Sequence, residues 1–258
     1  MESTTRVLVI RFSSMGDVIL ASPVVRALHL MLDGPVEVHF LTKRAFVDAV
    51  EGLPGVTRTW AIDRTTAEVE EGLQGVGFHY VVDLHANARS GFVKRALRKG
   101  EGRTFDLTVD KRSLDKILLV QTGWDRLGGQ HVVERYLGTL KPFGDALERL
   151  RRAGDEGALA LPPSAPTAKE PLEVVLALGA AHEGKAIPED HWSAVVAGLL
   201  EDGRRVHLIG GPAERNLADR LKEFAGDQVV NRCGVTWSET FALLSEAAST
   251  EACVRVSD

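Results

Sequence analysis

The stretch VLVIRFSSMGDVILA, residues 7–21, decides the fold. Its first four residues are apolar and mostly β-branched, which is typical of a strand buried on both faces. The polar loop RFSSMGD follows at residues 11–17, and an apolar stretch with helical character begins at Val18. A strand, a tight turn and a helix in this order begin a βα unit, and such units build parallel sheets covered by helices.

The same alternation continues through the first half of the chain. We expect strands over residues 6–10, 36–41, 57–61, 79–84 and 103–106, and helices over residues 17–31, 44–51, 65–73, 90–98 and 131–141. The pattern predicts an α/β fold, with one doubly wound domain over residues 1–143.

Residues 144–171 break this rhythm with a charged patch followed by four prolines within ten residues, at 162–171. Such a composition predicts a linker stiffened by proline. The alternation then restarts, with strands expected over 172–178, 205–209, 228–231 and 252–256, and helices over 190–200, 213–224 and 238–248. We therefore expect a second domain over residues 172–258. It is incomplete, because domains usually have roughly 100–150 residues.

The composition excludes several classes of protein. Hydrophobic residues make up 44% and charged residues 26%, as in a soluble globular protein, and the net charge of −5 argues against a nucleic-acid partner. The two cysteines, Cys233 and Cys253, have no metal-like spacing. No apolar run approaches the roughly 18 residues of a membrane span, and the N-terminus lacks the apolar core of a signal peptide. We expect a cytoplasmic protein.

The loop at residues 11–17 lies where ligands bind in an open α/β sheet, beyond the carboxyl end of a strand. It contains neither the glycine pattern of a dinucleotide site nor that of a P-loop, which disfavours a hydride-transfer enzyme and an NTPase. Asp17 stands at the start of the following helix. It either caps that helix or acts in catalysis, and the local pattern leaves both open.

A second loop of interest follows the strand expected at residues 79–84. Residues 85–116 carry nine Lys and Arg against four Asp and Glu, a local excess of positive charge. These side chains are either solvated helix faces or a site for a polyanionic acceptor. The candidate cations are Arg89, Lys94, Lys111 and Arg112.

Two loops of the second domain contain glycine and charge. The stretch GAAHEGKAIP at residues 179–188 precedes a helix, and backbone N–H groups with Lys185 form a plausible phosphate cradle there. Gly210 and Gly211 follow the next strand, and because they lack side chains they allow a ligand to approach the backbone closely there. Glu214 follows in the first helical turn, where it either complements the helix dipole or accepts a hydrogen bond from a nucleoside hydroxyl.

Taken together, these motifs resemble the ADP-heptose:lipopolysaccharide heptosyltransferases, glycosyltransferase family 9, over essentially the whole chain. The motifs that carry the resemblance are VIRFSSMGDVILASP at 9–23, DLHANARS at 83–90, HVVERY at 131–136, the turn from Gly179 through Lys185 and Pro188 to Trp192, and IGGPAE at 209–214.

The resemblance implies an inverting enzyme of the GT-B type, with two Rossmann-like domains facing a cleft. It would transfer a heptose from ADP-heptose, without a metal cofactor, to an anionic lipid-linked acceptor of the lipopolysaccharide inner core. It also implies possible peripheral contact with the cytoplasmic face of the inner membrane. Asp17 would be the general base, Lys185 would offset charge on the departing diphosphate, and Glu214 would contact the nucleoside.

The residues implied for the donor are Gly179, Ala180, Ala181, Lys185, Gly210, Gly211, Glu214 and Asp258. Those implied for the acceptor are Ser13, Ser14, Met15, Gly16, His85, Asn87, Arg89, Lys111 and Arg112.

Two departures from the family pattern bear on activity. Ala180 and Ala181 stand where many members carry a hydroxyl side chain, and the chain ends at Ser257-Asp258, inside a family motif that continues as Ser/Thr-Gly-x-x-His. These departures imply a heptosyltransferase truncated at its C-terminus. The alternative is a non-catalytic remnant with at most weak nucleotide or acceptor binding. A different GT-B enzyme, such as a nucleotide-sugar epimerase, is disfavoured by the 11–17 signature.

Overall fold

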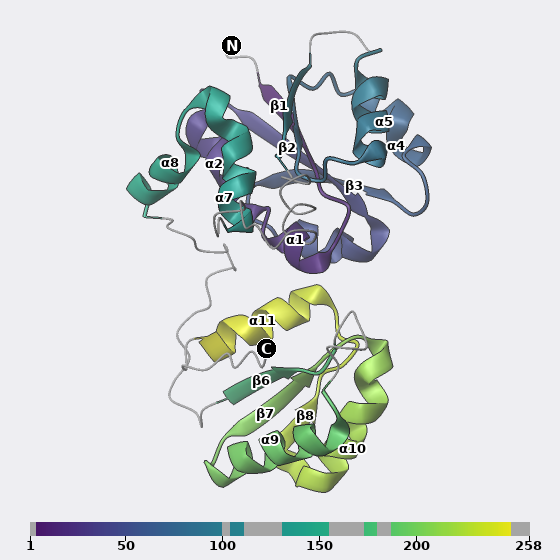
Figure 1. Cartoon of the computed structure of the whole chain (residues 1–258), viewed down its shortest axis with the longest axis vertical. Coiled ribbons are helices and arrows are strands. Elements are labelled where there is room, and N and C mark those ends of the chain that lie inside the picture. The colour runs from purple at the N-terminus through teal and green to yellow at the C-terminus, as the bar shows by residue number, and fades with distance from the viewer. Residues whose placement is uncertain (1–3, 100–103, 111–130, 155–172, 180–186, 249–258) are drawn as a thin grey trace, which may run out of the picture. The chain divides into compact units, whose positions relative to one another are not determined.

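The computed structural model describes residues 4–99, 104–110, 131–154, 173–179 and 187–248 (Figure 1). The chain divides into two compact units, residues 1–160 and 161–258. Each unit contains a parallel sheet with its own helices, so the prediction of an α/β fold with parallel sheets is confirmed. In the described part of the chain no helix is long and apolar enough to cross a membrane.

The first unit is built on a five-stranded parallel sheet of order β3-β2-β1-β4-β5. Its strands are β1 (Thr5–Ile10), β2 (Val36–Lys43), β3 (Val56–Ile62), β4 (Tyr80–Asp83) and β5 (Phe105–Thr108). Its helices are α1 (Met15–Ile19), α2 (Ser22–Met31), α3 (Val47–Glu51), α4 (Ala67–Gln74), α5 (Ala88–Leu97), α7 (Val132–Leu137) and α8 (Ala146–Arg152), with short 3₁₀ turns at Arg44–Phe46 and Gly138–Phe143. This is the strand order of a Rossmann-like domain.

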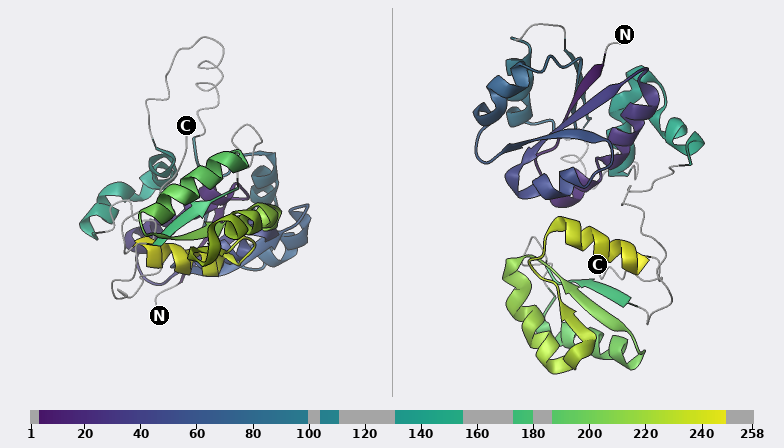
Figure 2. Two further views of the ribbon diagram at one scale, coloured as in Figure 1. Left: turned by 90° about the horizontal axis from the view of Figure 1, so that it is seen from below. Right: turned by 180° about the vertical axis from the view of Figure 1, so that it is seen from behind.

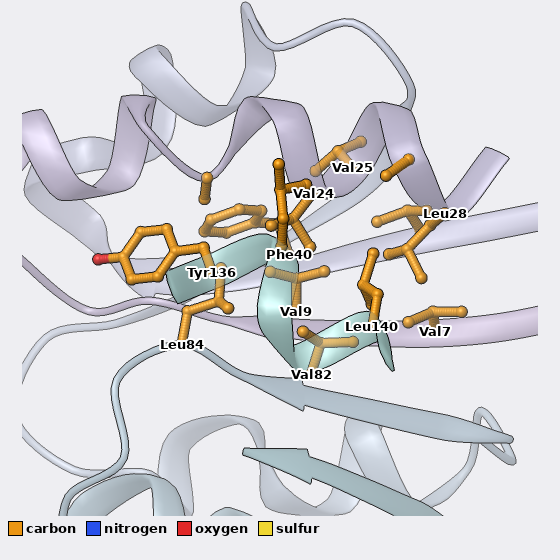
Figure 3. Close-up of a cluster of buried hydrophobic side chains, with 14 of the residues drawn as sticks. Val7, Val9, Val24, Val25, Leu28, Phe40, Val82, Leu84, Tyr136 and Leu140 are labelled. Atoms are coloured by element: carbon orange, nitrogen blue, oxygen red, sulfur yellow. The ribbon is translucent and has the colours of Figure 1, made fainter. Parts of the chain in front are cut away.

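Alternate residues of β1 face two separate hydrophobic cores. Val7 and Val9 pack with side chains of α2, α7 and α8, whereas Leu8 and Ile10 pack with side chains of α4 and α5 on the other face (Figure 2). All four side chains are fully buried, and Figure 3 shows the first of these cores. Burial on both faces explains why the strand is apolar at every position instead of at every second one.

The helix predicted over residues 17–31 is two helices. Helix α1 ends at Ile19, and α2 begins at Ser22 with Pro23 in its first turn. In a single helix, Pro23 could not donate the backbone hydrogen bond to Ile19, and its ring would clash with the Ile19 carbonyl. In the first turn of a new helix the backbone N–H has no partner within the helix, so proline is tolerated there.

The segment predicted as a linker, from residue 144, begins with a helix in the structure. Residues Ala146–Arg152 form helix α8, and Ala146 and Leu150 are buried in the core shared with α2. Asp145 caps this helix, because its Oδ1 accepts a hydrogen bond from the N–H of Glu148 at 3.0 Å. The charged residues that suggested a linker are the solvent face of this helix. The prolines of that segment lie outside the described residues.

The second unit contains a three-stranded parallel sheet of order β6-β7-β8. Its strands are β6 (Glu173–Ala177), β7 (Arg205–Ile209) and β8 (Val229–Asn231), and its helices are α9 (Glu189–Glu201), α10 (Arg215–Ala225) and α11 (Trp237–Ala248), with 3₁₀ turns at Pro212–Glu214 and Gly226–Gln228. Val174 and Leu176 pack with side chains of α9 and α10, and Val175 packs with Leu243 of α11 on the other face (Figure 2). The strand predicted over residues 252–256 lies outside the described residues.

Candidate functional site

The candidate site of the first unit lies at the carboxyl ends of β1 and β4. These two strands are neighbours, with Ile10 in register with Asp83. The chain adds β2 and β3 on one side of β1 and then crosses over to β4 on the other side, so this edge is the topological switch point where open α/β sheets bind ligands. The loops at residues 11–14 and 84–87 both start here.

Asp17 is held at the start of helix α1. Its Oδ2 accepts hydrogen bonds from the backbone N–H of Ser14 at 3.1 Å and from the Ser14 hydroxyl at 2.9 Å. The guanidinium of Arg11 lies 2.5 Å from the same oxygen. The N-cap of α1 is Ser14, and Asp17 is its partner at the third helical position in a capping box, a role that engages only one of its two oxygens.

The other oxygen, Oδ1, contacts a residue that the sequence did not indicate as part of the site. The hydroxyl of Tyr136, on α7, donates a hydrogen bond to Oδ1 at 3.3 Å. Arg11 lies beside both residues: its Nη1 donates to the carbonyl of Leu84 at 2.7 Å, and its guanidinium carbon is 5.6 Å from the centre of the Tyr136 ring. Arg11, Asp17 and Tyr136 thus form a cluster drawn from the loop after β1, from α1 and from α7.

The surroundings keep Asp17 ionised. Partial burial raises the pKa of its carboxyl, but the hydrogen bonds from Ser14 and the charge of Arg11 outweigh burial, so the net pKa lies below the usual value. The side chain is 29% exposed. A charged carboxylate that remains reachable at a sheet edge can accept a proton from a bound hydroxyl.

A buried ion pair supports the loop after β4. Oδ1 of Asp83 accepts hydrogen bonds from the backbone N–H groups of His85 at 3.0 Å and Ala86 at 2.7 Å, and Oδ2 lies 3.0 Å from the ammonium of Lys94. Lys94 also donates to the hydroxyl of Thr108 at 2.9 Å. Lys94 was a candidate cation for a polyanion, and the structure places its charge against Asp83 instead.

Two further candidates of this loop, His85 and Arg89, lie close to Phe12. The His85 ring meets the Phe12 ring edge-on, with centroids 5.2 Å apart, and the Arg89 guanidinium lies 5.8 Å from the same ring. Asn87 caps helix α5, because its Oδ1 accepts a hydrogen bond from the N–H of Ser90 at 3.0 Å. Of the loop before α1, Ser14 and Gly16 are exposed, while Ser13 and Met15 are half-buried. Lys111 and Arg112 lie outside the described residues.

The candidate site of the second unit lies at the carboxyl ends of β6 and β7. The structure brings three predicted glycines against the side chain of Glu214. A Cβ added to Gly210 would be 2.9 Å from Cβ of Glu214, one on Gly211 would be 3.2 Å from its Oε2, and one on Gly179 would be 3.3 Å from its Cδ. A side chain at Gly210 would therefore displace Glu214, and one at Gly179 or Gly211 would crowd it. Ala180, Ala181, Lys185 and Asp258 lie outside the described residues.

The two sites suit different chemistry. The first offers a carboxylate beside aromatic and cationic side chains, and the second offers a glycine-rich backbone at two strand ends with an acidic side chain above it. In the described part of the chain, no three His, Cys, Asp or Glu side chains are grouped as a metal site requires.

A family model and solved structures both relate the chain to heptosyltransferases. A family model described as "Glycosyltransferase family 9 (heptosyltransferase)" matches residues 66–250, a range that begins after the loop of Asp17. No curated protein matches the chain.

Solved structures match over nearly the whole chain. The E. coli heptosyltransferase WaaC with ADP has a TM-score of 0.68 at 20% identity, over 94% of this chain and 79% of that one. ADP-heptose LPS heptosyltransferase II of E. coli has a TM-score of 0.67 at 13% identity, over 93% of this chain and 77% of that one. The glycosyl transferase family 9 protein of Veillonella parvula DSM 2008 has a TM-score of 0.63 at 14% identity, over 89% of this chain and 69% of that one. At these identities the likeness establishes the fold.

Proposed function

Because the chain belongs to glycosyltransferase family 9, the heptosyltransferases, we propose that it transfers a heptose from ADP-heptose to an inner-core acceptor of lipopolysaccharide. The observation that carries the proposal is the ionised carboxylate of Asp17 at the switch point of the first sheet. The donor is suggested by WaaC, whose structures are with ADP and with ADP-2-deoxy-2-fluoro heptose.

In the proposed reaction Asp17 is the general base. The acceptor hydroxyl gives its proton to the Asp17 carboxylate while its oxygen attacks the anomeric carbon of the heptose. The bond between that carbon and the ADP oxygen breaks, and its electron pair leaves with ADP, so the configuration at the anomeric carbon inverts. A carboxylate positioned in this way typically contributes about 10²–10⁴-fold to the rate.

The donor residues of the proposal belong to the second unit. The backbone at Gly179, Gly210 and Gly211 would take the diphosphate, and the ammonium of Lys185 would offset its charge as ADP departs. Glu214, held against the glycines, would accept a hydrogen bond from a nucleoside hydroxyl. Ala180, Ala181 and Asp258 complete the proposed donor set, and no metal is required.

The acceptor is proposed to be an anionic, lipid-linked sugar that meets the first unit. Arg89 carries a cationic group close to the Asp17 loop on the β4 side, since its guanidinium lies over Phe12, the residue after Arg11. A guanidinium binds phosphate and carboxylate bidentately. The proposed acceptor set also includes Ser13, Ser14, Met15, Gly16, His85, Asn87, Lys111 and Arg112. A lipid-linked acceptor implies peripheral contact with the cytoplasmic face of the inner membrane.

The direct test is transfer by the purified chain. We expect ADP release from ADP-heptose that depends on a deep-core lipopolysaccharide acceptor, together with an acceptor product heavier by one heptose in mass spectrometry. Calorimetric titration with ADP separates donor binding from turnover. A chain that gives neither product nor heat of ADP binding would contradict the proposal and favour a non-catalytic member of the family.

Substitution of Gly210 by alanine is expected to weaken donor binding about tenfold, a change of about 1.4 kcal/mol in binding free energy. The added Cβ would stand 2.9 Å from Cβ of Glu214 and 3.3 Å from the sulfur of Cys233, so Glu214 must move. The dissociation constant of ADP, measured by titration calorimetry, checks this prediction.

The matched control is Gly198→Ala, in the exposed face of α9. A Cβ there meets nothing within 4 Å, and alanine favours the helix. We expect Gly198→Ala to keep the affinity for ADP. Equal affinities of the two variants would show that the Glu214 turn does not hold the nucleotide.

A further inference from the structure

The two oxygens of Asp17 have unequal numbers of donors. Oδ2 receives the backbone N–H and the hydroxyl of Ser14 and the guanidinium of Arg11, whereas Oδ1 receives only the hydroxyl of Tyr136. An ionised carboxylate offers about four acceptor positions, two on each oxygen. The donors on Oδ2 therefore saturate that oxygen, and Oδ1 keeps one position without a donor among the described residues.

Tyr136 is fixed in place by its ring. Its side chain is 3% exposed and packs in the core with Val9, Val24 and Leu84, and Figure 3 shows the hydroxyl at the margin of this cluster, pointing away from the aliphatic side chains. Burial raises the pKa of the Tyr136 hydroxyl to about 12, with a further contribution from the charge of Asp17. The hydroxyl therefore stays protonated at physiological pH and remains a donor to Oδ1.

Arg11 fixes the opposite side of the carboxylate. Its Nη1 is held by the carbonyl of Leu84 at 2.7 Å, and its side chain is 12% exposed. With Arg11 and Ser14 on Oδ2 and Tyr136 on Oδ1, the carboxylate plane is held at both oxygens. Rotation about the bond that carries the carboxylate would break contacts at both ends.

We propose that Tyr136 is a positioning residue, whose hydrogen bond orients the Asp17 carboxylate so that Oδ1 receives the proton of the acceptor hydroxyl. The inference rests on the proposed function and deepens it, since it assigns the proton to one atom and gives a role to a residue of α7. Oδ2 is unsuited to this task because its acceptor positions are already filled.

Among the described residues, Arg11 is the charged group that shifts the pKa of the Asp17 carboxyl. Arg135 is adjacent to Tyr136 on α7 and lowers the pKa of its hydroxyl slightly against the effect of burial. Helix α3, which packs against α1, carries Asp48 and Glu51, and both are exposed. Arg11 is the charge that acts on Asp17, so a change in the pKa of Asp17 on removal of the Tyr136 hydroxyl reports the hydrogen bond itself.

The variant Tyr136→Phe removes the hydroxyl and keeps the buried ring. We expect kcat to fall about tenfold with an unchanged KM for ADP-heptose, because the hydrogen bond acts on the base and not on the donor. A hydrogen bond to the ionised form lowers a pKa, so its removal raises the pKa of Asp17. The acidic limb of the kcat/KM profile, which reports ionisation of the base, therefore moves to higher pH.

The matched control is Tyr80→Phe, which alters the only other tyrosine of the chain. Tyr80 packs on Phe105 and Phe143, away from Asp17, and its variant is expected to keep the kcat and the pH profile of the unchanged protein. A Tyr136→Phe variant with the same kcat and acidic limb as Tyr80→Phe would overturn the proposal.

A second measurement separates this inference from the proposed function. The Asp17 carboxyl is titrated by ¹³C NMR in the unchanged protein, in Tyr136→Phe and in Tyr80→Phe, with Asp17→Asn used to assign the signal. We expect a higher pKa of Asp17 in Tyr136→Phe alone. An unchanged pKa overturns the role of Tyr136 whatever the activity, whereas a raised pKa in a chain without transfer activity contradicts the proposed function only.

Discussion

Asp17→Asn is expected to lower the rate of heptose transfer by about 10²–10⁴-fold, because the amide cannot accept the proton of the acceptor hydroxyl. Asparagine keeps the shape of the side chain and an oxygen that can accept from Ser14, so the first turn of α1 should still form. ADP release in the presence of acceptor measures the loss, and titration with ADP should give an unchanged affinity, since the proposed donor residues belong to the second unit.

The control for this substitution is Asp48→Asn, an exposed aspartate of α3 in the same unit. It changes the net charge equally and should leave the rate unchanged. If Asp17→Asn transferred heptose at the rate of Asp48→Asn, Asp17 would serve only as the partner of the N-cap Ser14 in the first turn of α1, and another residue would have to be the base.

Asp83→Ala is expected to cost about 3–5 kcal/mol of the free energy of unfolding of the first unit, the range found when one partner of a buried ion pair is removed. Asp83 is 1% exposed and Lys94 is 17% exposed, so the substitution leaves the ammonium of Lys94 without its counter-charge. It also leaves the N–H groups of His85 and Ala86 without their acceptor. Urea denaturation followed by circular dichroism measures the change.

Two further variants test the reason for that loss. Asp63→Ala removes a carboxylate from an exposed pair with Arg44, in which both side chains are more than half exposed, and should destabilise the unit far less. The double substitution Asp83→Leu with Lys94→Met removes both charges and should recover part of the loss. A loss in Asp83→Ala no larger than that in Asp63→Ala would contradict the structural role of the pair.

The central strands were predictable from the sequence because burial on both faces makes them apolar at nearly every position. The apolar run at residues 7–10 is the clearest case. The strand it forms lies between β2 and β4, as the first strand of a Rossmann-like sheet does. Helix α8 was not predictable, since its short apolar face of Ala146 and Leu150 is hidden among charged residues next to a proline-rich stretch. The prediction of a continuous helix over residues 17–31 overlooked the effect of Pro23.

The site was predictable where its residues lie within one loop and not where they meet through the fold. The contact between Asp17 and Ser14 joins residues only three positions apart, a spacing that can be read directly from the sequence. The contact of Asp17 with Tyr136 joins positions 119 residues apart, so no local sequence pattern could predict it. Lys94 was a candidate for ligand binding on the basis of local charge alone, because the buried Asp83 beside it becomes visible only in the structure.

The two compact units bury their side chains in different hydrophobic clusters. The side chains around Val9 belong to one core and those around Leu176 to another, so melting is expected to follow two cooperative transitions, not one. A ligand that binds the folded form of one unit raises the melting temperature of that unit's transition more than that of the other. Calorimetric scans with ADP or with acceptor therefore assign each ligand to its unit without any measurement of turnover.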